Sequence, residues 1–216
     1  MSFVVHSILG SPYGRTVLAA LEEKGASYRL AGLVPGAHKS EAHLARHPFG
    51  RVPVLEHGDF RLYETQAILR YLDRVLPEPA LTPRNAKAAA RMDQAMNVND
   101  WYLFQGVANI VVFERVVGPR LFNKPPDEAA LAAAMPKARV VFPELGRLLG
   151  AGPWFAGETF SLADLMIGPQ LDLFRLAPEW EELTESAPAL RGYVERVEAR
   201  PSFEATTWSN VAKMAA

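Results

Sequence analysis

The stretch "GRVPVLEHGDFRLYETQAIL", residues 50–69, predicts a β-hairpin that runs directly into a helix. The two runs VPVLEH and FRLYE flank Gly58-Asp59, a residue pair that favours a tight hairpin turn. Over residues 65–76 the apolar side chains recur at helical spacing, as Ala67, Ile68 and Leu72 illustrate. The stretch therefore predicts two antiparallel strands followed by an amphipathic helix.

The residues before this hairpin predict a parallel βαβ unit and a further short helix. Residues 3–9 and 27–33 are rich in strand-forming side chains, while 12–25 and 40–47 have helical patterns. Ser11 is placed to cap the first helix, Pro12 occupies its first position and Gly25 ends it. The predicted order βαβαββα gives a small mixed sheet covered by helices.

The residues after the hairpin predict an all-helical region. Three prolines interrupt residues 76–85, which we interpret as a linker. Gly106 is expected to disturb a long helix over 85–118, Pro136 and Pro143 to kink or divide a helix over 127–150, and Ser161 with Asp164 to form a capping box. A further helix, 188–201, is expected to stop at Pro201. The predicted domains are residues 1–77, a linker at 78–86, and a helical domain over 87–216.

Composition and charge exclude several classes of protein. The chain has 216 residues, 49% of them hydrophobic, and a net charge of −1 that gives no attraction towards nucleic acid. The absence of cysteine excludes disulfides, thiolate metal sites and cysteine nucleophiles. No secretion signal is recognised at the start, and the longest apolar run, VANIVVF, is too short to span a bilayer. We expect a soluble cytoplasmic protein with no nucleic-acid or membrane partner.

The histidines are candidates for a metal-binding site. All five lie in the first domain, and His43 and His47 stand four residues apart on a predicted helix. No acidic residue at metal-ligand spacing accompanies them. We therefore predict a solvated helix face and no metal site.

The chain resembles the soluble glutathione transferases along nearly its whole length. The resemblance rests on "GAHKSEAHLARHPFGRVPVLEHGDFRLYETQAILRYL" (36–72) and on "FAGETFSLADLMIGP" (155–169). The first segment is most similar to the phi branch and less so to theta. The resemblance implies a thioredoxin-like domain followed by an all-helical domain. It also implies glutathione as co-substrate, a cytoplasmic homodimer and a role in detoxification.

The resemblance assigns glutathione-binding roles to residues of the first domain. Val52 would pair through its backbone with the cysteinyl part of glutathione, like an added strand, before a cis-Pro53. Glu64 would hold the ligand's amine, and the N–H groups at Thr65 would bind the γ-glutamyl carboxylate, where the family usually has Glu-Ser. The glycyl carboxylate would be held by His38, Lys39 and, in place of the family's usual glutamine, Arg51.

Activation of the thiol requires a donor that stabilises the thiolate. Ser11 is the preferred candidate, because "LGSPYGR" places it after the first strand and before the first helix, as in the family's catalytic-serine loop. The Ser11-to-Arg15 spacing matches theta, whereas the loop is about a residue shorter than in phi. Tyr13 is the alternative, because a tyrosine hydroxyl activates the thiol in other branches. Ser7 is expected to lie within the strand.

The resemblance also implies a pocket for a hydrophobic electrophile between the domains. The candidates on the long helix are Trp101, Tyr102, Gln105 and Asn109, beside Phe104 and Phe113 in an aromatic stripe that is otherwise typical of a core. The leading hypothesis is transfer of glutathione to electrophiles. Glutathione-dependent peroxide reduction at the same site, or a non-catalytic glutathione-binding or regulatory protein, are the alternatives.

Overall fold

The computed structural model describes residues 2–214 and divides into two compact units. Among the described residues, the first contains 2–81 together with 199–214, and the second contains Thr82–Glu198. Each unit has its own buried apolar core. Within the described residues, no helix combines the length and the apolar character needed to cross a membrane.

The first unit is built on a mixed sheet, as predicted. Its described strands, β1 (Phe3–Ile8), β2 (Tyr28–Leu33), β3 (Val54–His57) and β4 (Phe60–Tyr63), lie in the order β2-β1-β3-β4. Strands β1 and β2 run parallel, whereas β1–β3 and β3–β4 are antiparallel. The predicted hairpin is confirmed, with His57 opposite Phe60 across the Gly58-Asp59 turn.

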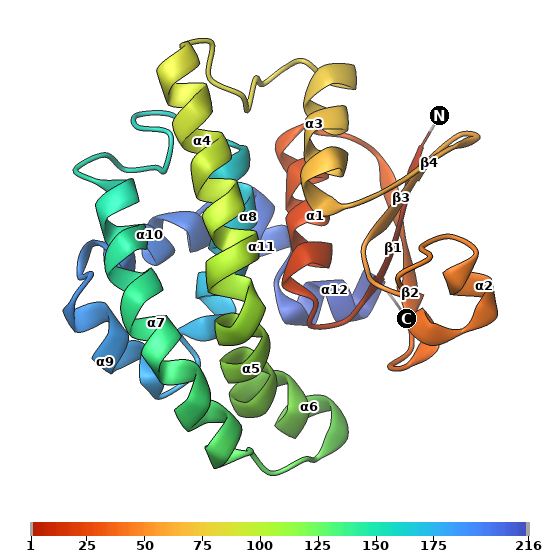
Figure 1. Ribbon diagram of the computed structural model, residues 1–216. Helices are drawn as coiled ribbons and strands as arrows, with labels where there is room; N and C mark the ends of the chain where they lie inside the picture. The colour runs from red at the N-terminus through yellow and green to blue at the C-terminus, as the bar shows by residue number, and fades with distance from the viewer. Residues whose placement is uncertain (1, 215–216) are drawn as a thin grey trace. The chain divides into compact units, whose positions relative to one another are not determined.

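Helices cover both faces of this sheet. Helices α1 (Pro12–Glu23) and α3 (Thr65–Val75) lie on one side of the sheet, and α2 (Glu41–Leu44), preceded by the 3-10 turn η1 (Ala37–Lys39), lies on the other (Figure 1). Val17, Leu18 and Leu21 of α1 are buried against the apolar side of α3 and the sheet. Apolar positions at helical spacing thus produced these elements as the sequence indicated.

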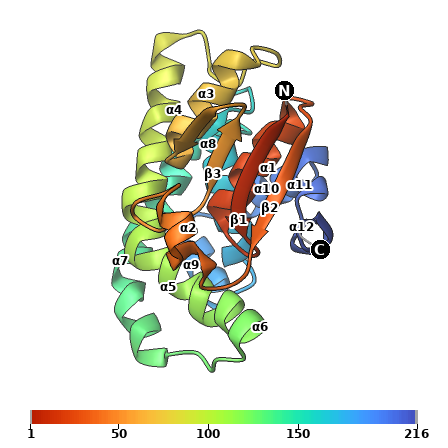
Figure 2. The same cartoon turned by 90° about the vertical axis from the view of Figure 1, so that its right-hand side faces the viewer.

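The carboxyl-terminal residues differ from the predicted domain division. The prediction placed all of 87–216 in the helical domain, but the structure groups the residues from Ala199 onwards with the first unit. Helix α11 (Pro201–Ala205) packs on α1, and α12 (Trp208–Met214) follows beside β2 (Figure 2). The physical reason is an ion pair and an apolar contact: Arg200 binds the Glu23 carboxylate at 2.7 Å, and Phe203 is fully buried.

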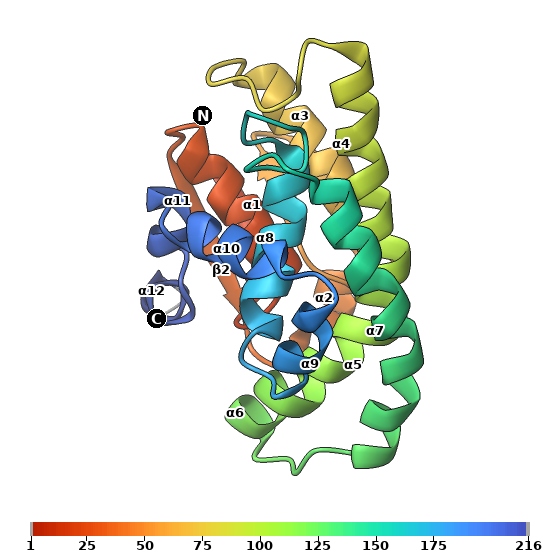
Figure 3. The ribbon, with the colours of Figure 1, turned by 90° about the vertical axis from the view of Figure 1, so that its left-hand side faces the viewer.

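The second unit is all-helical. Its elements in chain order are α4 (Ala86–Val98), η2 (Asn99–Ala108), α5 (Asn109–Val112), η3 (Phe113–Val117), α6 (Gly118–Phe122), α7 (Glu128–Leu149), α8 (Leu162–Phe174), α9 (Glu179–Glu185) and α10 (Ala189–Glu198). Figure 3 shows α8 surrounded by α4, α7 and α10. Helix α8 is buried on almost every side, because its sequence is apolar all round.

Of the two predicted helix irregularities, the one at Gly106 is confirmed and the division at the prolines of α7 is not found. Gly106 breaks the long helix as expected: Gln105 has ψ 112° and Gly106 has φ +83°, inside a stretch of wider π-type turns. Pro136 and Pro143 do not divide α7, which runs unbroken from Glu128 to Leu149. Burial of Leu131, Phe142 and other residues along α7 stabilises the helix despite the two missing N–H groups.

The predicted capping box at the start of α8 is present. The Asp164 carboxylate accepts from the Ser161 N–H at 2.9 Å, the Ser161 hydroxyl at 2.8 Å and the Phe155 N–H at 3.0 Å. Burial raises the pKa of Asp164 to about 6, although these three donors act in the opposite direction. One carboxylate thus fixes both the helix start and the preceding loop.

Candidate functional site

Ser11 stands at the amino-terminal end of α1, where unpaired N–H groups and the helix dipole favour a negative charge. Its Oγ accepts from the Gly14 N–H at 3.1 Å, so Ser11 is the N-cap. A hydroxyl that accepts through its oxygen still has its proton to donate. Capping and donation to a sulfur are therefore compatible at this residue, which is half-buried.

The two other hydroxyl candidates have different surroundings. Ser7 lies within β1, is 4% exposed and packs its side chain against Gly14 of α1. The prediction that Ser7 lies in the strand is confirmed, and its hydroxyl is enclosed. Tyr13 is the second residue of α1, close in sequence to Ser11 and half-buried.

A turn delivers the chain from β1 to Ser11. The Ser11 N–H donates to the Ile8 carbonyl oxygen at 3.2 Å, which closes a four-residue β-turn. Gly10 occupies the third position with φ +83°, a conformation that other residues rarely adopt. The turn explains how a loop this short reaches the start of α1.

Val52 and Pro53 precede β3. The Val52–Pro53 peptide bond is cis, as the family resemblance implied. The pairing of β3 with β1 and β4 begins at Val54, so Val52 lies before the recorded ladder. A segment that adjoins a strand but lies outside its ladder can pair with a peptide-like ligand.

Glu64 and Thr65 form the junction between β4 and α3. Glu64 is the N-cap residue, with φ 71° and ψ 113° and no side-chain capping bond, and it is exposed. Thr65 is the first residue of the helix and is buried. An L-residue with this φ is uncommon, and such strain is found disproportionately at ligand sites. The Glu64 carboxylate makes no capping bond and is exposed, so it is accessible to a ligand.

His38 and Lys39 lie beside the segment that leads to Val52. A Cβ at Gly50 would stand 3.0 Å from the His38 carbonyl oxygen and 3.1 Å from Lys39 Cδ, so the two loops touch. Burial, followed by the charge of Lys39, lowers the pKa of His38, which keeps its ring neutral at neutral pH. Lys39 and Arg51 are both exposed, so the two cations at these loops are accessible.

His43 and His47 correct the prediction of a solvated helix face. They are 1% and 2% exposed. His43 Nε2 lies 2.8 Å from the Arg51 carbonyl oxygen, and the His47 ring lies 4.6 Å from the Tyr63 ring. The described residues contain no group of three or more side chains able to hold a metal ion. The histidines pack the loop that carries Arg51 and Val52.

His47 is a residue of the site that sequence reasoning missed. Burial lowers its pKa most, the charges of His43 and Arg51 lower it further, and the Glu64 carboxylate raises it. The His47 ring packs on Tyr63, the residue before Glu64, which places it near that carboxylate. The available signal was its position between the short helix and the "PFGRVP" segment, within the stretch that carried the resemblance.

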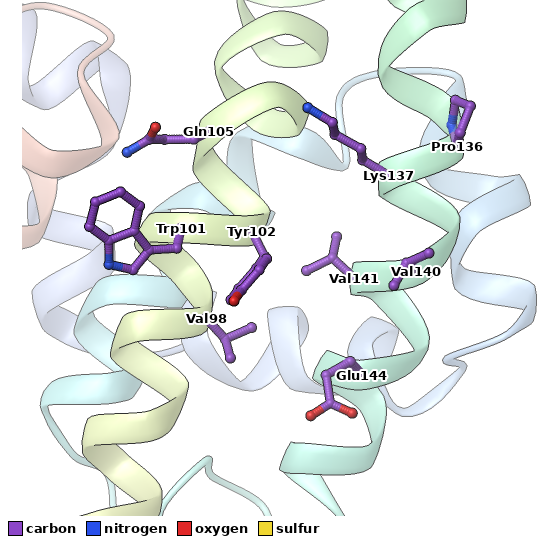
Figure 4. Close-up of a pocket in the computed structure, with 9 residues that line it drawn as sticks. All are labelled: Val98, Trp101, Tyr102, Gln105, Pro136, Lys137, Val140, Val141 and Glu144. Carbon is purple, nitrogen blue, oxygen red and sulfur yellow. The ribbon is translucent and has the colours of Figure 1, made fainter.

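The predicted electrophile residues are only partly brought together. A cavity of about 700 Å³ between η2 and α7 is lined by Val98, Trp101, Tyr102, Gln105, Pro136, Lys137, Val140, Val141 and Glu144. Figure 4 shows Val98 and Tyr102 between the two helices, whereas Trp101 and Gln105 extend away from α7. Asn109 does not line this cavity, because its Oδ1 accepts from the Gly106 N–H at 2.8 Å, at the break in the helix.

Comparison with known proteins gives consistent matches. Residues 5–80 match the family model for the glutathione S-transferase N-terminal domain, and 128–196 match that for the C-terminal domain. A probable glutathione S-transferase of Oryza sativa subsp. japonica is 34% identical over 68% of this chain and 69% of its own length. A glutathione S-transferase of Hyoscyamus muticus is 30% identical over 94% of this chain and 96% of its own.

Solved structures agree with the sequence matches. Apo glutathione S-transferase III superposes with a TM-score of 0.84 at 28% identity, over 100% of this chain and 98% of that one. Glutathione S-transferase-I bound to lactoylglutathione gives 0.81 at 26% identity, over 95% and 98%. The chain therefore belongs to the glutathione S-transferase family as an enzyme of that class, with its sequence pattern closest to the phi branch.

Proposed function

We propose that this enzyme transfers the glutathione thiolate to hydrophobic electrophiles, with the Ser11 hydroxyl as the donor to the sulfur. The single observation that carries the proposal is Ser11 at the N-cap of α1, accepting from Gly14 N–H with its own proton left to donate. Nucleophilic attack by the sulfur forms the carbon–sulfur bond. The electrophile's leaving group departs, or its double bond or ring takes the electron pair and then a proton.

The free energy needed to stabilise the bound thiolate is modest. A free thiol has a pKa of about 8.5, and lowering it by about 2 units needs roughly 2.7 kcal/mol of thiolate stabilisation. One charge-assisted hydrogen bond contributes about 1.5–3 kcal/mol. A hydroxyl donor at a helix amino terminus, where the dipole adds about 0.3–1 kcal/mol, is sufficient. Tyr13 is the alternative donor if Ser11 is not the one.

We assign the rest of glutathione to the loops described above. Val52 would pair with the cysteinyl backbone before cis-Pro53, as its position directly ahead of β3 suggests. Glu64 would bind the ligand's amine, and the N–H groups at Thr65 its γ-glutamyl carboxylate. Exposed cations at Lys39 and Arg51, with the neutral His38 ring beside Lys39, suit the glycyl carboxylate.

The electrophile would contact aromatic side chains of η2. Trp101 and Gln105 extend away from α7 and are both exposed, which leaves them available to a second substrate. The other two predicted residues do not share this side of η2: Tyr102 lies between η2 and α7, and Asn109 accepts from the Gly106 N–H. An apolar wall with few polar groups fits a hydrophobic electrophile.

The homodimer is a separate proposal. The cavity between η2 and α7 is mainly apolar, and Val140 beside it is 72% exposed. Apolar surface of this kind is usually covered by a partner. Sedimentation equilibrium checks the assembly: wild type is expected at twice the chain mass and Val140→Glu at a reduced association constant. A monomeric wild type would contradict it.

The test of thiol activation is an ultraviolet titration of thiolate in the enzyme–glutathione complex across pH. Wild type is expected to give a thiol pKa about 2 units below the free value, and Ser11→Ala to lose most of that shift while still binding. A shift retained in Ser11→Ala but lost in Tyr13→Phe would transfer the role to Tyr13. Binding without any lowered pKa would favour a non-catalytic glutathione-binding protein instead.

A further inference from the structure

The carboxyl-terminal segment, residues 199–214, contacts the chain on both sides of Ser11. Trp208 of α12 packs on Gly10, the residue before Ser11. Arg15, four residues after Ser11, donates to the Phe203 carbonyl oxygen at 3.1 Å. Both contacts lie within the first unit. The segment therefore touches the turn that leads into α1 and the first turn of α1 itself.

The contact at Gly10 is unusually close. A Cβ built on Gly10 would stand 2.5 Å from Trp208 Cη2 and 2.8 Å from Cζ3, distances that a real side chain could not tolerate. The six-membered ring of the indole thus lies directly on the Gly10 backbone. Glycine is needed here for this approach as well as for its φ of +83°.

The contact at Arg15 holds the first turn of α1, which follows Ser11 in the chain. Its guanidinium lies 5.2 Å from the centre of the Phe203 ring, and that ring is fully buried. The Arg15 N–H donates to the Ser11 carbonyl oxygen at 3.0 Å. Further along α1, the Glu23 carboxylate binds Arg200 and the Ser202 hydroxyl. Helix α11 is thereby attached along the length of α1.

We propose that Trp208 is a positioning residue for thiol activation, which holds the Ile8–Ser11 turn so that the Ser11 hydroxyl meets the sulfur. The inference rests on the proposed role of Ser11. Trp208 touches the turn backbone, and it acts through Ser11.

The position of the Ser11 hydroxyl matters because a hydrogen bond to the sulfur forms only over a narrow range of distances and angles. A hydrogen bond to an anion weakens steeply once its angle falls below about 120° or the donor moves beyond hydrogen-bonding distance. A displacement of about 1 Å near reacting atoms can cost on the order of 10²-fold in rate. The Gly14 N–H orients Ser11 Oγ relative to α1, whereas the indole limits where the turn places the Ser11 backbone.

The experiment compares Trp208→Ala with Met214→Ala, a control on the same helix. Met214 is 40% exposed and contacts Tyr28 of β2, away from the Ser11 turn. For Trp208→Ala we expect the pKa of the bound glutathione thiol to rise by about 1 unit and kcat to fall about tenfold. KM for glutathione should change by less than about threefold. Trp208→Phe, which keeps an aromatic ring over the turn, should recover part of both changes.

Each outcome decides the inference. An unshifted thiol pKa in Trp208→Ala, with only a lower melting temperature, would overturn it, because a purely structural role moves stability alone. An equal rise in Met214→Ala would also overturn it. If Trp208→Ala does not fold, Trp208→Leu carries the same comparison. A wild-type enzyme that binds glutathione without a lowered thiol pKa would overturn the proposed function itself.

Discussion

Glu64 gives the sharpest prediction, because stability and binding should change in opposite directions. Its φ of 71° and ψ of 113° are unfavourable for any residue with a Cβ, and its side chain makes no capping bond. Glu64→Gly removes the Cβ and the carboxylate together. Glu64→Gln is the matched control, since it keeps the Cβ and the size but removes the charge.

The magnitudes follow from these two features. Backbone strain of this kind costs of the order of 1–3 kcal/mol, and the extra conformational freedom of an unfolded glycine offsets about 0.5–1 kcal/mol. Glu64→Gly should therefore raise the free energy of unfolding by about 1 kcal/mol. Losing a charge-assisted contact with the ligand's amine costs about 1.5–3 kcal/mol, which corresponds to a dissociation constant roughly 10- to 150-fold weaker.

Two assays separate the effect on the free energy of unfolding from the effect on glutathione binding. Urea denaturation of the ligand-free enzyme should give Glu64→Gly above wild type and Glu64→Gln within about 0.5 kcal/mol of it. Calorimetric titration with glutathione should show both variants binding more weakly by similar factors.

Either of two results would refute the reasoning. If Glu64→Gln binds glutathione as tightly as wild type, the carboxylate does not hold the amine. If Glu64→Gly is no more stable than Glu64→Gln, the unusual φ is not a source of strain, and its link to ligand binding is lost.

Four further predictions follow from the described contacts. Asp164→Ala should lower the free energy of unfolding by about 3–5 kcal/mol, measured by denaturation, because two buried N–H groups lose their acceptor; a loss under about 1 kcal/mol would contradict this. Because the pKa of Asp164 is raised from 3.8 to about 6, the folded state holds a proton that the unfolded chain releases, so its contribution to stability should fall as pH rises through this range. The pKa of His47 is lowered in the folded state, so the free energy of unfolding should fall as pH drops below 6.5. His47→Gln should reduce the change of melting temperature with pH in that range; an equal change in wild type and variant would argue against it. Lys39→Ala should weaken glutathione about 5-fold at low salt and less at high salt, since the lost contact is an exposed ion pair; a salt-independent change in affinity would contradict that role.

Several local features of both units could be predicted from the sequence near them. The hairpin at Gly58-Asp59, the N-cap at Ser11 and the box of Ser161 and Asp164 depend on residues within a few positions of one another. Local hydrogen bonds and apolar periodicity report such features directly. The break at Gly106 belongs to the same class, because glycine is the residue that tolerates its φ.

Other features of the site depend on residues far apart in the chain. His43 and His47 have the spacing of an exposed helix face, yet the loop at Arg51 and the ring of Tyr63 bury them. Helical spacing likewise did not reveal that the Asn109 side chain accepts from the Gly106 N–H and does not line the cavity. Burial is decided by what packs against a residue, and periodicity alone carries no record of it.

The sequence by itself determined the elements of the first sheet, their order and the residue types of the candidate glutathione site, because these follow from local propensity and from motifs within 36–72. Only the tertiary structure decided that Glu64 adopts a positive φ, that His47 lies beside it, and that Trp208 rests on Gly10 nearly two hundred residues earlier in the chain. Such contacts form when chain closure brings distant segments together, and their energy depends on the shape of both partners.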